Sequence, residues 1–171
     1  MSAYSLSHIP DPVLLRDLAA LVARDRATTA TLLAHLAEVD ARRLYLPAAH
    51  PSMYSYCVHE LGLSEEAAFK RIRAARTARR FPAVFAALAD GRLHLTAVVM
   101  LSSYLTPENA DELLAAAAHQ TRAGIERLLA KRFPRPDLPE RLEAISSPVA
   151  NGELSPGTVE APGLDFRQLA P

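Results

Sequence analysis

The chain has 171 residues, half of them hydrophobic, and its 19 Lys and Arg residues balance its 19 Asp and Glu residues to a net charge of zero. This composition excludes a chain that is disordered throughout and a uniformly basic nucleic-acid coat, although a local basic patch stays compatible with it. The single cysteine excludes an intrachain disulfide and a multi-cysteine zinc site. The sequence shows no signal peptide and no membrane-spanning stretch, so we expect a cytoplasmic protein without a membrane partner.

Abundant Ala, Leu and Arg, with only 6 Gly and no Trp, predict an all-α fold. After an N-terminal extension at 1–12, leucines recur at spacings of three and four from Leu14 to Val39. This pattern predicts a long N-terminal helix to about Arg43, either continuous or divided into two helices near Thr28. Such a helix can pack on its own domain or pair with a copy of itself.

Capping residues divide the rest of a predicted multi-helix domain, 13–145, into shorter helices. Prolines after Phe133 end the helical pattern, apart from one predicted turn at 140–145. Residues 146–171 are rich in Pro, Ser and Gly and lack periodicity, so they are predicted to form a disordered C-terminal tail or a linker. The predicted helices run from Ser52 to about Leu61, Ser64 to about Arg79, Pro82 to Asp90, Leu95 to Tyr104, Thr106 to about His119, and Thr121 to about Phe133.

The segment at about 52–80 is predicted to form a helix-turn-helix-like hairpin. The first helix ends at Leu61, Gly62 lies in the tight turn, Leu63 fills the corner and Ser64 caps the second helix. This turn followed by a basic helix resembles the DNA-reading helices of sigma-factor and response-regulator families.

The second helix of this hairpin carries six basic residues with no acid between them. We expect Ala68, Ile72 and Ala75 to face inward and Thr77 to lie on the opposite, exposed face with the basic side chains. Cationic side chains on such a helix reach DNA phosphates, and Arg also binds guanine. The alternative is that the charges only solvate a helix face. The candidate DNA-binding residues are Lys70, Arg71, Arg73, Arg76, Arg79 and Arg80.

No catalytic or metal-binding set can be assembled from the sequence. His50, Cys57 and His59 lie close together but lack a fourth ligand at a familiar zinc spacing. His94 and His119 are isolated and are predicted to cap helices or to lie on the surface. The sequence contains neither an assignable nucleophile with its base nor a glycine-rich phosphate loop, so it predicts no catalytic residue, no metal site and no cofactor.

An ordered series of motifs covers roughly residues 13–140. It comprises Leu32–Asp40, Arg43–Tyr45, Tyr54–Cys57, Leu63–Glu65, Arg71–Ile72, Ala74–Arg76, Ala78–Pro82, Gly91–Thr96, Leu105–Asn109 and Arg135–Asp137. In this order the motifs closely resemble the start of a bacterial HNH endonuclease family.

The resemblance implies a helical N-terminal region that, in full-length members, precedes an HNH nuclease module. That module has a ββα-metal fold in which a His activates water and a divalent metal ion stabilises the leaving group. Beyond Asp137 the sequence has no HNH signature, so we expect the nuclease module, and the divalent metal that it needs, to be absent from this chain. For the helical region, the resemblance implies DNA engagement or assembly.

The sequence therefore leaves two functions open. One is a non-catalytic domain that binds double-stranded DNA through the six basic residues. The other is a protein-interaction domain that forms a homodimer through its long N-terminal helix. The two are compatible because helix-turn-helix proteins commonly dimerise on paired half-sites. The leucines proposed for the dimer are Leu14, Leu18, Leu21, Leu32 and Leu36.

Overall fold

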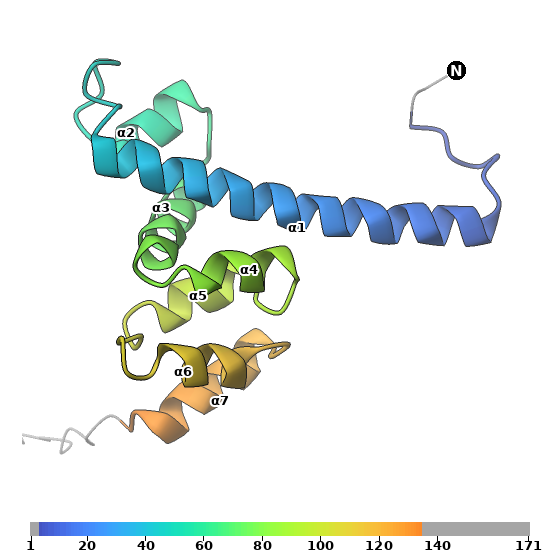
Figure 1. The fold of residues 1–171 in the computed structure, drawn as a ribbon. Coiled ribbons are helices and arrows are strands. Elements are labelled where there is room, and N and C mark those ends of the chain that lie inside the picture. Colours follow the sequence, from blue (N-terminus) through green and yellow to red (C-terminus); the bar gives the residue numbers. More distant parts are fainter. Residues whose placement is uncertain (1–3, 135–171) are drawn as a thin grey trace, which may run out of the picture. The chain divides into compact units, whose positions relative to one another are not determined.

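A computed structural model describes residues 4–134, and within them every regular element is helical (Figure 1). By its internal contacts the chain divides into Met1–Pro136, which holds all of these helices, and Asp137–Pro171. The predicted turn at 140–145 and the predicted tail at 146–171 lie outside the described residues. The helices are α1 (Asp11–Arg42), α2 (Met53–Ser55), the π-helical turn η1 (Tyr56–Glu60), α3 (Glu65–Arg80), α4 (Ala83–Ala89), α5 (Leu95–Leu101), α6 (Ala110–Ala117) and α7 (Arg122–Arg132).

The N-terminal helix α1 is continuous, and the alternative of two helices joined near Thr28 is wrong. Pro10 precedes its first turn, where a missing backbone N–H is tolerated because helix N-termini leave such donors unpaired. Arg43 ends the helix by adopting a left-handed conformation, with φ at 53°. The second half of α1 packs on α3 and α4, whereas its first half extends beyond the other helices (Figure 1).

Helix α3 is the centre of the domain, because α1 and α5 both pack against it. Small inward-facing residues, Ala68 and Ala75 among them, are buried and allow this close approach, as the sequence predicts. The exposed position predicted for Thr77 is wrong, because Thr77 is buried. Its hydroxyl donates to the Arg73 carbonyl oxygen at 2.8 Å, and this bond satisfies the polar group inside the core.

The predicted caps of three helices, Ser52, Ser64 and Thr121, are confirmed, and of the two alternatives predicted for His94 it adopts the cap. The side chains of Ser52, Ser64, His94 and Thr121 each accept a hydrogen bond from a backbone N–H in the first turn that follows. The hairpin turn before α3 is closed by Gly62, whose φ is 63°. The predicted helix–turn–helix order is therefore present, although its first helix is mostly the π-helical turn η1.

The expected helix start at Thr106 is displaced. Helix α6 begins at Ala110, because the Asn109 side chain accepts a hydrogen bond from the Thr106 N–H and donates one to the Tyr104 carbonyl oxygen, each at 2.9 Å. Those bonds hold 104–109 as a turn. Helix α5 also stops at Leu101, three residues before the predicted end. No helix in the described part of the chain is long and apolar enough to cross a membrane.

Candidate functional site

The six predicted DNA-binding residues all lie on α3, but they leave this helix in different directions. At about 100° per residue, Arg71 lies nearly opposite Arg73 and Arg80. Arg73, Arg76 and Arg80 line one cavity, Arg71 lines another, and Lys70 and Arg79 line neither. The six basic residues predicted to form one DNA-binding surface therefore face different ways.

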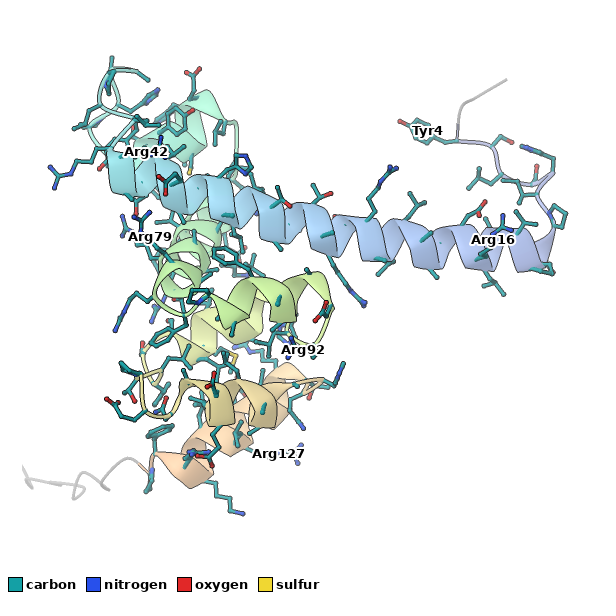
Figure 2. The ribbon with its side chains drawn as sticks, viewed as in Figure 1. Tyr4, Arg16, Arg42, Arg79, Arg92 and Arg127 are labelled. Carbon is teal, nitrogen blue, oxygen red and sulfur yellow. The ribbon has the colours of Figure 1, made fainter. Side chains whose placement is uncertain are left out.

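Two of the arginines connect α3 to the end of α1. Arg76 donates two hydrogen bonds to the Asp40 carboxylate, at 2.7 and 3.1 Å. Arg79 reaches α1 (Figure 2) and donates to the Glu38 carboxylate at 3.0 Å and to the Ala37 carbonyl oxygen at 3.2 Å. The hydrogen bond from Arg42, together with Arg79, lowers the pKa of Glu38. Both Arg76 and Arg79 thus stabilise the packing of α1 on α3.

Arg73 and Arg80 differ because no carboxylate in the described part of the chain pairs with them. Arg73 donates to the hydroxyls of Ser102 and Ser103, at 2.7 and 2.6 Å. The Arg80 guanidinium lies over the Phe81 ring, 5.3 Å from its centroid. Lys70, by contrast, pairs with Glu66 one turn earlier on the same helix. On this side of α3, the guanidinium charges of Arg73 and Arg80 are therefore left for an external anion.

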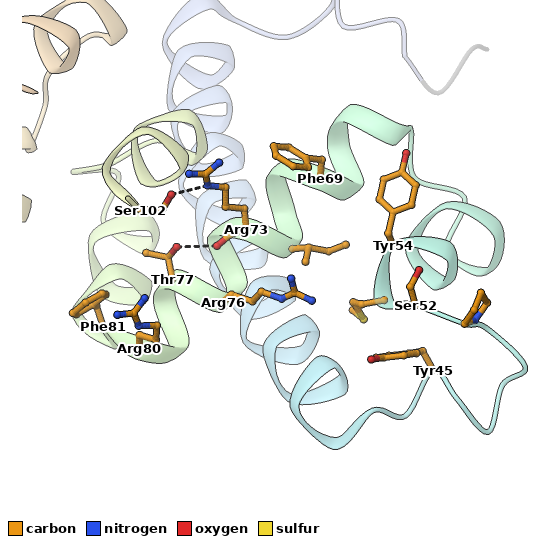
Figure 3. Close-up of a pocket in the computed structure, with 13 residues that line it drawn as sticks. Tyr45, Ser52, Tyr54, Phe69, Arg73, Arg76, Thr77, Arg80, Phe81 and Ser102 are labelled. Carbon is orange, nitrogen blue, oxygen red and sulfur yellow. Dashed lines mark hydrogen bonds between the residues drawn. The ribbon is translucent and has the colours of Figure 1, made fainter. Parts of the chain in front are cut away.

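These arginines share a cavity of about 590 Å³ beside α3, which we call the arginine–aromatic cavity. Figure 3 shows Arg73, Arg76 and Arg80 on one wall, with Tyr45 and Tyr54 on the other. Among residues 4–134, no Asp or Glu lines it. Guanidinium groups beside aromatic rings suit a ligand that combines an anion with a flat or apolar body. The aromatic members, Tyr45, Tyr54, Phe69 and Phe81, are functional candidates that the sequence pattern did not reveal, because they come from three separate segments.

A second candidate surface is the first half of α1, where large apolar side chains face water. Leu15 and Leu18 are 67% and 56% exposed. Leu33 and Leu36 lie 18 residues further on, which is about five full turns and therefore the same side of the helix, yet they are 0% and 3% exposed. The apolar face that anchors α1 to the domain thus has an uncovered counterpart on the first half, beyond the polar residues Asp25, Arg26 and Thr29. We call this surface the free leucine face; its members are Leu14, Leu15, Leu18, Leu21 and Val22.

Two histidines and the cysteine have local structural roles. His94 caps α5, with its Nδ1 atom accepting from the Ala97 N–H at 3.0 Å. His50 packs edge-on against Tyr56. Cys57 is fully buried, and this burial raises the pKa of its thiol. Residues 4–134 contain no group of three or more His, Cys, Asp or Glu side chains able to hold a metal ion.

In comparisons with known proteins, no protein-family model, no curated protein and no solved structure matches this chain. The resemblance to HNH endonucleases accordingly stays a prediction. The fold and its surfaces define a small helical module with a free leucine face on α1 and a basic, aromatic cavity beside α3.

Proposed function

We propose that the chain is a self-associating helical module in which two copies pair through the first half of α1. The observation that carries this proposal is the change in exposure along one face of one helix, from the exposed Leu15 and Leu18 to the buried Leu33 and Leu36. Soluble monomers rarely leave a continuous apolar surface of this kind in water.

A second copy fits the free length of α1 in antiparallel orientation. When Leu18 of one copy lies opposite Leu21 of the other, Asp11 lies opposite Thr28. This register spans α1 from Asp11 to Thr28, ahead of Ala30, the first buried residue. It places Asp25 opposite Leu14, beside the domain, where the Arg26 side chain already lies against Gly91. A two-fold axis relates the two copies, as in most homodimers, so each of these residue pairs occurs twice.

The same register matches side chains along both edges of the helix pair. On one edge Asp17 lies beside Arg24 of the second copy, and symmetry repeats this ion pair. On the other edge Leu15 lies beside Val22 of the second copy. A parallel pair would instead place each residue at the level of its own counterpart and form neither contact, so charge and apolar patterning favour the antiparallel arrangement.

The magnitude of this interaction sets the concentration at which to look for it. Complete burial of a Leu or Val contributes about 1.5 to 3 kcal/mol, and these ten side chains are already about half covered, which leaves roughly 8 to 15 kcal/mol. Association itself costs about 4 to 15 kcal/mol. The two ranges overlap, so the net free energy of association is small, and we test for the dimer from micromolar concentrations upward.

Sedimentation equilibrium of the full chain from about 5 to 200 μM tests the proposal. We expect a concentration-dependent dimer that Leu18→Glu abolishes, because the substitution places a carboxylate at the centre of the pair. Leu44→Glu is the matched control, because Leu44 is also an exposed leucine but lies outside the free leucine face. A wild-type chain that stays monomeric throughout would overturn the proposal.

A charge exchange tests the orientation separately. Asp17→Arg and Arg24→Asp should each weaken the dimer, because each places like charges side by side in the antiparallel pair. The double variant should restore the wild-type association constant, because an Arg at position 17 then forms an ion pair with an Asp at position 24 of the other copy. Failure of the double variant to recover would exclude this register.

DNA binding is a second candidate function, favoured by one observation. Arg73, Arg76 and Arg80 follow a spacing of three and four along α3 and line the arginine–aromatic cavity, which has no acidic residue from the described part of the chain. Such a surface can bind the DNA backbone, and a dimer would present two copies of it. The resemblance to the N-terminal region of HNH endonucleases supports the same partner.

A salt titration of binding to a fluorescent random-sequence duplex tests this second function. We expect the double variant Arg73→Gln with Arg80→Gln to weaken binding, because each substitution removes a charge that neutralises a phosphate. The slope of log affinity against log salt should fall by about 1 for each phosphate that the variant no longer neutralises. Arg122→Gln is the control, because Arg122 is exposed on α7 and pairs with Glu126. Equal weakening in the control and in the double variant would remove α3 as the DNA-binding surface.

A further inference from the structure

A second cavity, of about 520 Å³, lies on the other side of α3 from the arginine–aromatic cavity. Side chains from α1, α3, the α4–α5 connection and the α6–α7 connection line it. Its cationic and imidazole side chains are Arg26, Arg71, Arg92, His94 and His119, and Asp25 is the one acidic lining residue that the described part of the chain supplies.

Arg71 brings a buried, unpartnered donor to this cavity. Its Nε atom is shielded from water and has no hydrogen-bond partner among the described residues. No carboxylate in that part of the chain forms an ion pair with its guanidinium. A buried polar donor without an acceptor is costly, and such groups are normally paired. Arg71 lines the cavity, so an anion bound there would balance the charge of its guanidinium group, which no carboxylate in the described part of the chain balances.

Arg26 is held at the same cavity by a glycine. A Cβ atom at Gly91 would come within 2.4 to 2.8 Å of the Arg26 guanidinium, so the side chain lies directly on the Gly91 backbone. The φ of Gly91 is 74°, a conformation that glycine adopts without strain. Arg26, like Arg71, pairs with no carboxylate in the described part of the chain. Arg92, by contrast, pairs with Asp90 at 3.2 Å.

The two loops that bring the remaining groups to the cavity are joined to each other. The His119 N–H donates to the Arg92 carbonyl oxygen at 2.7 Å. His94 accepts at Nδ1 from the Ala97 N–H, so its Nε2 carries the ring proton in the neutral form. The cavity wall is therefore a framework in which the two loops are joined by a backbone hydrogen bond.

We infer that this cavity binds a phosphorylated small molecule, with Arg71 and Arg26 donating to the phosphate oxygens. Guanidinium groups match the geometry of phosphate oxygens and bind them with charge-assisted hydrogen bonds. The volume lies within the range of about 300 to 1,000 Å³ that is usual for small-molecule sites, which is larger than a lone phosphate requires. This site is separate from both the free leucine face and the arginine–aromatic cavity.

Isothermal titration calorimetry of the full chain with pyrophosphate and with ADP tests the inference. We expect saturable binding that Arg71→Met weakens by about tenfold or more, as removal of one charge-assisted hydrogen bond would. Arg73→Met is the matched control, because it removes the same charge from the same helix on the opposite side. Circular dichroism confirms folding of each variant, and Arg26→Met, on an exposed position, repeats the test if Arg71→Met does not fold.

Three results would overturn the inference. The first is the absence of saturable binding for both probes. The second is equal weakening by Arg71→Met and Arg73→Met. The third is displacement of bound ADP by a short DNA duplex at stoichiometric concentration, which would assign the cavity to the nucleic-acid backbone.

Discussion

The two halves of α1 share one helix and one apolar face but have opposite surroundings. Leu33 and Leu36 pack into the core, whereas Leu15 and Leu18, on the same side, face water. The helical period places leucines on this side in both halves, with the polar residues Asp25 and Thr29 between them, because the period depends only on local geometry. What covers that side depends on where the other helices lie. The comparison teaches that one sequence pattern can serve two contacts, within the domain and, as we propose, between copies.

The largest expected effect is the loss of stability caused by a substitution in the covered half of α1. Leu33→Ala should lower the free energy of unfolding by about 2 to 5 kcal/mol, because it removes buried apolar atoms and leaves a cavity. Leu15→Ala, on the same face, should change it by less than about 0.5 kcal/mol in a dilute monomer. Urea unfolding of both variants measures the difference. If α1 pairs with a second copy, the destabilisation caused by Leu15→Ala grows with protein concentration, while that of Leu33→Ala does not.

An intermediate effect concerns the ion pairs that hold the covered half. Asp40 accepts two hydrogen bonds from Arg76 and has a side chain only 16% exposed. Asp40→Asn should therefore lower the free energy of unfolding by about 1 to 2 kcal/mol, since it removes a charged acceptor from a partly dry position. Glu38→Gln should have a smaller effect, because Glu38 is much more exposed. A larger destabilisation by Glu38→Gln than by Asp40→Asn would contradict this order.

Local signals predict the elements of the fold well. Ser64 and Thr121 cap the helices expected of them, and Gly62 forms the expected turn. These features depend on residues within one turn of each other, so sequence alone determines them. Thr106 shows the limit of such signals, because it is followed by a proline at a good helix start, yet the Asn109 side chain holds that segment as a turn.

The candidate sites are harder to predict because they depend on packing between distant segments. Arg71, Arg73 and Arg76 look like one strip in the sequence, but their spacing sends Arg71 to a different side of α3. Asp40 is 36 residues from Arg76, and no local pattern indicates their ion pair. The polarity of Thr77 predicts an exposed position, whereas its bond to the Arg73 carbonyl oxygen lets it enter the core.

The smallest expected effect is a pH dependence at the end of the covered half. Hydrogen bonds from Arg42, and then from Arg79, lower the pKa of Glu38 in the folded chain. A carboxyl group with a lowered pKa stabilises the fold above its unfolded pKa of about 4.3, and this contribution disappears as the pH falls through the lower, folded value. Urea unfolding between about pH 3 and pH 7 should therefore show a slightly steeper acid destabilisation for the wild type than for Glu38→Gln. The difference between wild type and Glu38→Gln should shrink in an Arg42→Met background, because the largest cause of the lowered Glu38 pKa is then absent. An undiminished difference would mean that another group causes the acid destabilisation.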